Sequence, residues 1–210
     1  LCKVCFPLWK VSFTCIIYLL FALQLNAQDL QLYQKENFHT GKNVLPYRIL
    51  YPENFDKTKK YPLVLMLHGS GERGNDNELQ LTHGAALFVN PEIRKKFPAI
   101  VIFPQCPADD YWSNVDLSSI VNDRRNYVFR EDGEPTPGMK MLIAFIDDLL
   151  KKPYIDERRL YVGGLSMGGM GTFELLSRKP KLFAAAFPIC GGGHPNTVKA
   201  YAKEVNLWVF

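Results

Sequence analysis

Residues 163–169 have the sequence Gly163-Gly164-Leu165-Ser166-Met167-Gly168-Gly169, and this stretch decides the fold. It stands between a short apolar run at 159–163, which predicts a buried strand, and residues 169–178, which predict a helix. A serine at such a strand-to-helix turn is held in a strained backbone with its hydroxyl exposed above the sheet. The alternative is a glycine-rich turn that contains a serine by chance. Because a strand precedes and a helix follows, we interpret Ser166 as a nucleophile.

A second motif, His68-Gly69-Ser70-Gly71, directly follows another apolar run. In enzymes that attack a carbonyl with such a serine, the loop after this strand supplies one backbone N–H for the oxyanion, and the residue after the serine supplies the other. We therefore expect the amides of Ser70 and Met167 to form this pair. His68 is interpreted as a brace of the loop rather than as the base, since the base follows the nucleophile in this arrangement. The glycines expected to permit these close backbone approaches are Gly69, Gly71, Gly164 and Gly168.

Strands are predicted at 44–51, 61–67, 99–103, 160–163 and 184–189, with a helix opened by Thr136-Pro137 and continuing to Leu150. The alternation of strands and helices predicts an α/β fold with a mostly parallel sheet and helices on both faces. Ligands of such sheets bind at the carboxyl ends of the strands, where both glycine-rich motifs lie.

The stretch 109–135 is polar, and Trp112, Tyr127 and Phe129 are spaced among its charges. It is too long for an ordinary connection, which favours a functional loop over the strand ends. Trp112 is a candidate for lining the substrate site. The alternative is a disordered insertion, and the aromatic residues argue against it.

Four segments together resemble the α/β-hydrolase superfamily: HGSGERG at 68–74, FPQCP at 103–107, GGLSMGG at 163–169 and PICGGG at 188–193. They are similar to the phospholipase/carboxylesterase-like esterases of bacteria, often called predicted peptidases and related to dienelactone hydrolase and prolyl oligopeptidase. The resemblance covers about residues 46–210 and implies an eight-stranded sheet. The strand-like run 206–210 would then be about the seventh strand. The acid and histidine of a catalytic triad would follow it, so the resemblance implies a chain truncated before both.

The N-terminal residues 1–27 contain two cations, Lys3 and Lys10, no acidic residue, and an apolar run at 11–25 that ends in Leu25-Asn26-Ala27. This pattern predicts a secretory signal peptide cut after Ala27, and hence a secreted or periplasmic protein. A membrane anchor is the alternative, but the run is short and contains polar residues. The hydrolase domain would span 28–210, with no stable membrane insertion after cleavage. The net charge of +4, half of it from Lys3 and Lys10, indicates no nucleic-acid partner.

The histidines have no spacing typical of metal ligands, so no metal site is predicted. His194 is the one histidine after Ser166 in this sequence, but its expected loop position makes it a poor substitute for a triad base. Cys106 and Cys190 follow different predicted strands, and we interpret them as buried free thiols rather than a disulfide.

The sequence thus predicts a serine esterase of class EC 3.1.1 that forms an acyl-enzyme on Ser166 and needs no cofactor. Its substrate would be a small-molecule, oligosaccharide or lipid ester. One alternative is a peptidase of the prolyl oligopeptidase type, which differs in leaving group and pocket. Another is a binding protein that retained the fold without catalysis. Without an acid and histidine, residues 1–210 alone are expected to be inactive. The sequence leaves the oligomeric state open.

Overall fold

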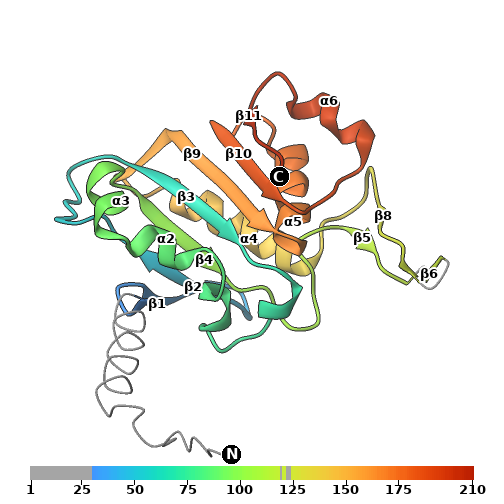
Figure 1. Cartoon of the computed structure of the whole chain (residues 1–210), viewed down its shortest axis with the longest axis horizontal. Coiled ribbons are helices and arrows are strands. Elements are labelled where there is room, and N and C mark those ends of the chain that lie inside the picture. The colour runs from blue at the N-terminus through green and yellow to red at the C-terminus, as the bar shows by residue number, and fades with distance from the viewer. Residues whose placement is uncertain (1–29, 119, 122–123) are drawn as a thin grey trace, which may run out of the picture.

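The computed structural model describes residues 30–118, 120–121 and 124–210 (Figure 1). Its main sheet has seven strands in the order β1-β2-β4-β3-β9-β10-β11. The pairs β1–β2 and β2–β4 are antiparallel, and the other four pairs are parallel. The strands are β1 (Gln34–Thr40), β2 (Asn43–Leu50), β3 (Tyr61–Leu67), β4 (Ile100–Pro104), β9 (Ile155–Leu165), β10 (Ala185–Ile189) and β11 (Asn206–Leu207). This is the α/β-hydrolase arrangement expected from the sequence.

Helices lie on both faces of the sheet, as Figure 1 shows. The helices α4 (Pro137–Leu149), α5 (Met167–Arg178) and α6 (Val198–Tyr201) share the larger core cluster with the sheet. On the opposite face, α2 (Ala85–Val89) and α3 (Pro91–Lys96) lie near β4, where Ala85 and Val89 join the smaller core cluster. The start of α4 matches the sequence prediction, because the Thr136 hydroxyl accepts a hydrogen bond from the N–H of Met139 at 3.1 Å. Short 3-10 turns are η1 (Ser70–Glu72), η2 (Leu79–Leu81) and η3 (Pro195–Thr197).

The predicted strands are present, with shifted ends. The strand predicted at 61–67 coincides with β3, whereas β9 begins five residues before residue 160, the predicted start of that strand. The run 206–210 continues alongside β10, since Trp208 and Phe210 donate backbone hydrogen bonds to Ala186 and Pro188. The prediction missed β1, a polar strand at the sheet edge in which Phe38 and Thr40 alone are partly buried.

The long stretch 109–135 forms an arm that projects from the domain (Figure 1). Two small antiparallel ribbons build it: β5 (Val115–Asp116) pairs with β8 (Val128–Phe129), and β6 (Ile120–Val121) pairs with β7 (Arg124–Arg125). The base of the arm returns to the domain, because Phe129 packs against Gly192 after β10. The arm therefore reaches the end of the sheet where the glycine-rich motifs lie.

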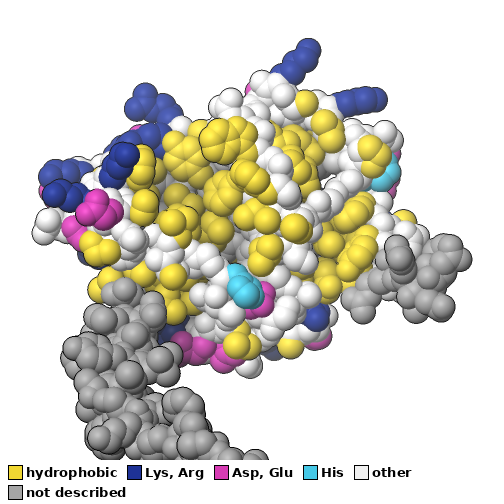
Figure 2. Space-filling model, in the orientation of Figure 1, with side chains coloured by type: hydrophobic (Ala, Val, Ile, Leu, Met, Phe, Trp, Pro, Cys, Tyr) yellow, Lys and Arg dark blue, Asp and Glu magenta, His cyan; other side chains and the backbone are white. Residues whose placement is uncertain are grey.

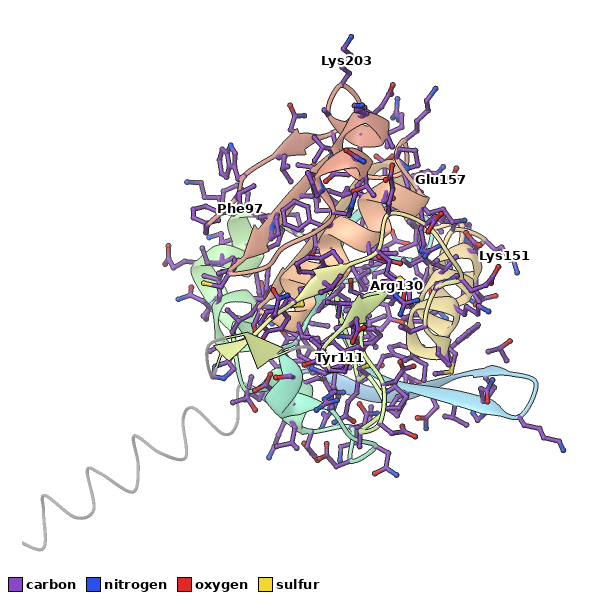
Figure 3. The ribbon with its side chains drawn as sticks, turned by 90° about the vertical axis from the view of Figure 1, so that its right-hand side faces the viewer. Phe97, Tyr111, Arg130, Lys151, Glu157 and Lys203 are labelled. Carbon is purple, nitrogen blue, oxygen red and sulfur yellow. The ribbon has the colours of Figure 1, made fainter. Side chains whose placement is uncertain are left out.

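One face of the molecule carries a broad apolar region (Figure 2). The most exposed large apolar side chains among the described residues are Trp208 at 74%, Phe210 at 68%, and Phe97 and Val209 at 60% each. Phe97 stands at the outer edge of α3 (Figure 3). Among the described residues, no helix has both the length and the apolar character needed to cross a bilayer. The predicted signal peptide, residues 1–27, lies outside the described residues.

Candidate active site

Ser166 lies at the junction between β9 and α5, where it is the N-cap residue of the helix. Its backbone has φ 55° and ψ −113°, a conformation that residues with a Cβ rarely adopt. The N–H of Ser166 donates to the carbonyl of Ile189 at 2.7 Å, which ties the junction to the end of β10. The side chain is exposed, and no described residue hydrogen-bonds to its hydroxyl. The geometry therefore presents a free hydroxyl above the carboxyl ends of the parallel strands.

The glycines beside Ser166 are required by close backbone contacts. A Cβ on Gly168 would lie 2.0 Å from the carbonyl oxygen of Leu67, and a Cβ on Gly164 would lie 2.5 Å from the backbone of Gly168. Both distances are far below van der Waals contact, and the partners are backbone atoms that cannot swing away. The start of α5 is thus pressed against the end of β3, which brings the two glycine-rich motifs together.

The loop after β3 reaches Ser166 directly. A Cβ built on Gly69 would lie 3.6 Å from the carbonyl oxygen of Leu165 and 3.9 Å from Ser166 Cβ. The next residue in the chain is Ser70, the first residue of η1, and it is exposed. Neither its N–H nor that of Met167 donates a hydrogen bond to another described residue. The first N–H groups of a helix have no acceptor within it, so both are available to an anion.

His68 is fully buried behind this loop, with 5% of its surface exposed. Its Nε2 accepts a hydrogen bond from the N–H of Cys106 at 2.9 Å, so the proton lies on Nδ1, which donates to the carbonyl of Gly69 at 2.6 Å. Burial lowers the pKa of His68 to about 4. The imidazole is therefore neutral at physiological pH, and both nitrogens hold the backbone in place. This is the bracing arrangement expected from the sequence.

The segment after β4 clamps the same loop through Gln105, which has no exposed surface. Its amide nitrogen donates to the carbonyl of Glu72 at 3.2 Å and to Asp76 Oδ1 at 2.9 Å. Its amide oxygen accepts from the N–H of Asn77 at 2.7 Å. The motifs predicted no role for Gln105, although a glutamine directly after a fully buried strand is an unusual residue that signals a buried polar contact.

Arg73 holds the loop from the other side. Its Nε donates to the carbonyl of Ser70 at 2.9 Å, and Nη1 donates to the carbonyl of Asp110 at 3.2 Å. The guanidinium also lies over the ring of Tyr111, 5.0 Å from its centroid, which is a cation–π contact. Figure 3 shows Tyr111 where the arm leaves the domain, beside the loop after β3. The arm and the loop are thus joined.

Trp112 does not line an open substrate site, which corrects the expectation from the sequence. Its side chain is 0% exposed, and its ring lies edge-on to His68 with 5.5 Å between centroids. A Cβ on Gly171 in α5 would lie 2.5 Å from Trp112 Cβ. An aromatic residue in a polar stretch can anchor that stretch in the core, and Trp112 anchors the base of the arm under α5.

His194 makes its interactions with residues other than Ser166. It is the N-cap residue of η3, and its Nδ1 accepts from the N–H of Asn196 at 3.3 Å and lies 3.9 Å from Glu131. It lines a cavity of about 390 Å³ between the arm and the outer side of α5, and Ser166 is not among the lining residues. No described histidine hydrogen-bonds to Ser166.

Asp147, which precedes Ser166 in the chain, and Glu174, which follows it, are held in ion pairs. Asp147 pairs with Lys179 at 2.9 Å, and Glu174 pairs with Arg178 at 2.7 Å. Asp156 is 7% exposed, and a hydrogen bond from Arg159 lowers the pKa of its carboxyl. In the described part of the chain, no three His, Cys, Asp or Glu side chains cluster in a way that could hold a metal ion.

The two described cysteines are free thiols, and they differ in environment. Cys106 is buried as expected, and burial raises the pKa of its thiol. Cys190 is exposed, which corrects the expectation of a second buried thiol. Its φ of 51° turns the chain out of β10 before Gly191, so its side chain leaves the core.

Comparisons with known proteins connect this geometry to two groups of hydrolases. Residues 136–199 match the prolyl oligopeptidase family. A dipeptidyl-peptidase 5 from Porphyromonas gingivalis is 26% identical over 171 residues, which are 80% of this chain and 22% of the relative. This chain therefore spans about a fifth of that relative's length.

Solved structures give the same fold. A thermostable esterase is 37% identical with a TM-score of 0.74, covering 87% of this chain and 47% of its own. A feruloyl esterase module from Clostridium thermocellum, complexed with sinapinate, is 17% identical with a TM-score of 0.57, covering 84% of this chain and 65% of its own. The second likeness shows the fold alone. The chain spans about half the length of the thermostable esterase.

Proposed function

We propose that this chain, which belongs to the α/β-hydrolase superfamily, is a serine hydrolase that cleaves carboxylic esters through an acyl-enzyme on Ser166. The observation that carries the proposal is the exposed, unbonded hydroxyl of Ser166, held at φ 55° on the N-terminus of α5. A strained junction keeps such a nucleophile in one orientation. The preference for esters is supported by the thermostable esterase, which is 37% identical over most of this chain.

In the proposed reaction, Ser166 Oγ attacks the ester carbonyl, and the carbonyl oxygen becomes an oxyanion between the N–H groups of Ser70 and Met167. Collapse of this intermediate expels the alcohol and leaves an acyl group on Ser166, which water then removes. Each N–H aimed at the oxyanion contributes about 3 kcal/mol of transition-state stabilisation. The proposal uses no cofactor.

We further propose that the base and its acid lie outside residues 28–210, in a longer form of the domain. The reason is that His68 uses both ring nitrogens on the backbone, and that His194 caps η3. His83 is the described histidine that faces the loop after β3, 3.5 Å from Glu72. Replacing His83 with alanine in the full-length protein should therefore leave ester hydrolysis in place. Loss of hydrolysis in that variant would make His83 the base.

Peptide cleavage is a second candidate function, supported by the prolyl oligopeptidase match over 136–199 and by the dipeptidyl-peptidase relative. The two functions share the nucleophile and the oxyanion site and differ in the leaving group. Rates on p-nitrophenyl butyrate and on dipeptidyl p-nitroanilides separate them, because an amine is a poorer leaving group than a phenol. Faster turnover of the dipeptidyl anilides would favour the peptidase.

The test of the nucleophile uses the full-length protein and a fluorophosphonate probe. The probe should label Ser166, and Ser166→Ala should abolish both labelling and ester hydrolysis. The exposed Ser118, which lies on the arm and bonds to Asp116, gives a matched control as Ser118→Ala. Undiminished labelling of Ser166→Ala would refute the assignment.

We also propose that the protein is exported and cut after Ala27, because residues 1–27 have the pattern of a signal peptide. N-terminal sequencing of exported protein should begin at Gln28. A mature protein that keeps residues 11–25 would instead indicate an anchor.

A further inference from the structure

Glu72 places a carboxyl group beside the candidate nucleophile. It is the last residue of η1, two positions after Ser70, and 14% of its side chain is exposed. Its backbone carbonyl is held by Gln105, so the position of Glu72 is fixed by the clamp on the loop. A carboxylate that is mostly withdrawn from water interacts more strongly with nearby charges than one on the open surface.

The distance from Glu72 to Ser166 follows from their shared neighbour, Gly69. A Cβ built on Gly69 would lie 2.9 Å from Glu72 Oε2 and 3.9 Å from Ser166 Cβ. Because both distances start from the Cβ built on Gly69, the separation between Glu72 Oε2 and Ser166 Cβ is at most the sum of these two distances. Glu72 and Ser166 therefore contact the same side of Gly69.

The negative charge of Glu72 has little compensation on that side. Oε1 lies 3.5 Å from Nε2 of His83, whose side chain is 58% exposed. No described residue donates a hydrogen bond to Oε2. The neighbouring cation, Arg73, directs its guanidinium to the carbonyls of Ser70 and Asp110. Asp76 adds a second carboxylate to this loop, held by Gln105 and by the backbone N–H groups of Glu78 and Leu79.

We propose that Glu72 is a specificity-determining residue, which favours esters that carry a positive charge close to the scissile carbonyl and disfavours esters that carry a carboxylate there. The inference rests on the proposed ester hydrolysis at Ser166. A substrate bound at Ser166 comes within a few ångströms of Oε2, because Oε2 and Ser166 Cβ lie on the same side of Gly69. At that range, and in a partly desolvated site, attraction or repulsion between single charges changes binding by at least about tenfold.

The experiment compares matched esters on the full-length protein at pH 7. One series has the charge on the acyl side: the p-nitrophenyl esters of 4-trimethylammoniobutyrate, pentanoate and glutarate. The other has the charge on the alcohol side: butyrylcholine and O-butyryl glycolate. The measured quantity is the ratio of kcat/KM for the cationic ester to that for the anionic ester. Glu72 acts on the oxyanion of every ester alike, so the ratio isolates charge selection.

Glu72→Gln keeps the shape and removes the charge, and it should lower this ratio at least about tenfold in one or both series. Glu72→Asp keeps the charge and should retain most of the preference. Glu92→Gln, an exposed carboxylate in the first turn of α3, is the control and should leave the ratio unchanged. Fluorophosphonate labelling of Ser166 reports that each variant is folded.

An unchanged ratio in Glu72→Gln, with normal labelling and hydrolysis, would overturn the inference and leave the proposed function standing. Absence of labelling and of ester hydrolysis in the unmodified protein would instead overturn the proposed function. A ratio that falls as far in Glu72→Asp as in Glu72→Gln would also contradict the inference, because the preference would then be lost although the charge is kept.

Discussion

Replacing Gln105 with alanine removes the side chain that joins the end of β4 to the loop carrying Ser70. Three hydrogen bonds are lost, to Glu72, Asp76 and Asn77. The N–H of Asn77 is left without an acceptor in a residue that is 8% exposed, which alone costs about 1–3 kcal/mol. The other two bonds contribute about 1 kcal/mol each, discounted for Asp76 because water can reach it. The vacated space adds about 1 kcal/mol.

We therefore expect Gln105→Ala to lower the free energy of unfolding by about 4 kcal/mol, which corresponds to a fall in Tm of roughly 8–16 °C. Gln105→Met fills the space without the hydrogen bonds, and it should recover about 1 kcal/mol of that loss. Urea unfolding of the full-length protein measures both. Gln34→Ala, on the exposed face of β1, is the control and should change stability by less than about 0.5 kcal/mol.

The same variants should slow fluorophosphonate labelling of Ser166 in protein that is still folded, by about tenfold or more, because the loop that carries Ser70, the proposed oxyanion donor, loses its clamp. A purely structural contact would lower Tm without slowing the labelling of the folded fraction. The reasoning is refuted if both Gln105 variants lose less than about 1 kcal/mol and are labelled at the normal rate.

Three further predictions concern residues around the same junction. The unfolded chain binds a proton at His68 near pH 6.5 and the folded protein only near pH 4, so stability should fall by about 3 kcal/mol as pH drops through this window. His68→Gln should flatten that slope in urea titrations, and an unaltered slope would contradict the burial argument. Gly168→Ala, whose Cβ would lie 2.0 Å from the oxygen of Leu67, should give insoluble protein, whereas Gly71→Ala, with nothing within 4 Å, should stay soluble. Ser166→Gly should be more stable than Ser166→Ala by about 1 kcal/mol in thermal unfolding, because glycine relieves the strain at φ 55°; equal stabilities would argue against strain there.

The parts of the fold that could be predicted from sequence are those with an unbroken apolar run. The strand β3 has such a run, since both its faces are buried, and its ends were predicted to the residue. The edge strand β1 contains Phe38 as its one large apolar residue, and its pairing is set by the turn at Gly41, where φ is 59°. An edge strand needs little apolar surface, so its sequence resembles a loop.

The candidate site divides in the same way. Ser166 and its glycines can be recognised in the sequence, whereas the positions of Glu72 and Gln105 within their motifs did not predict a role for either residue. Trp112 was misplaced because burial of an aromatic side chain depends on which helix covers it. That contact, with Gly171 in α5, joins residues far apart in the chain. Hydrophobic periodicity describes one helix or strand at a time, so it carries no information about a contact between distant segments.

The two halves of the site are held by different forces, and this explains what the motifs can and cannot specify. Around Ser166, the backbones of β3 and α5 approach so closely that glycine alone fits at 164 and 168. A steric requirement of this kind admits no side chain at these two positions. The loop that carries Ser70 is held by side chains, chiefly those of His68, Arg73 and Gln105. Glu72 lies in this loop, and its carboxylate takes no part in these side-chain contacts, so its charge is not required to hold the loop. The candidate nucleophile can therefore be recognised from the motif, whereas the proposed substrate preference depends on residues that the steric requirement does not fix.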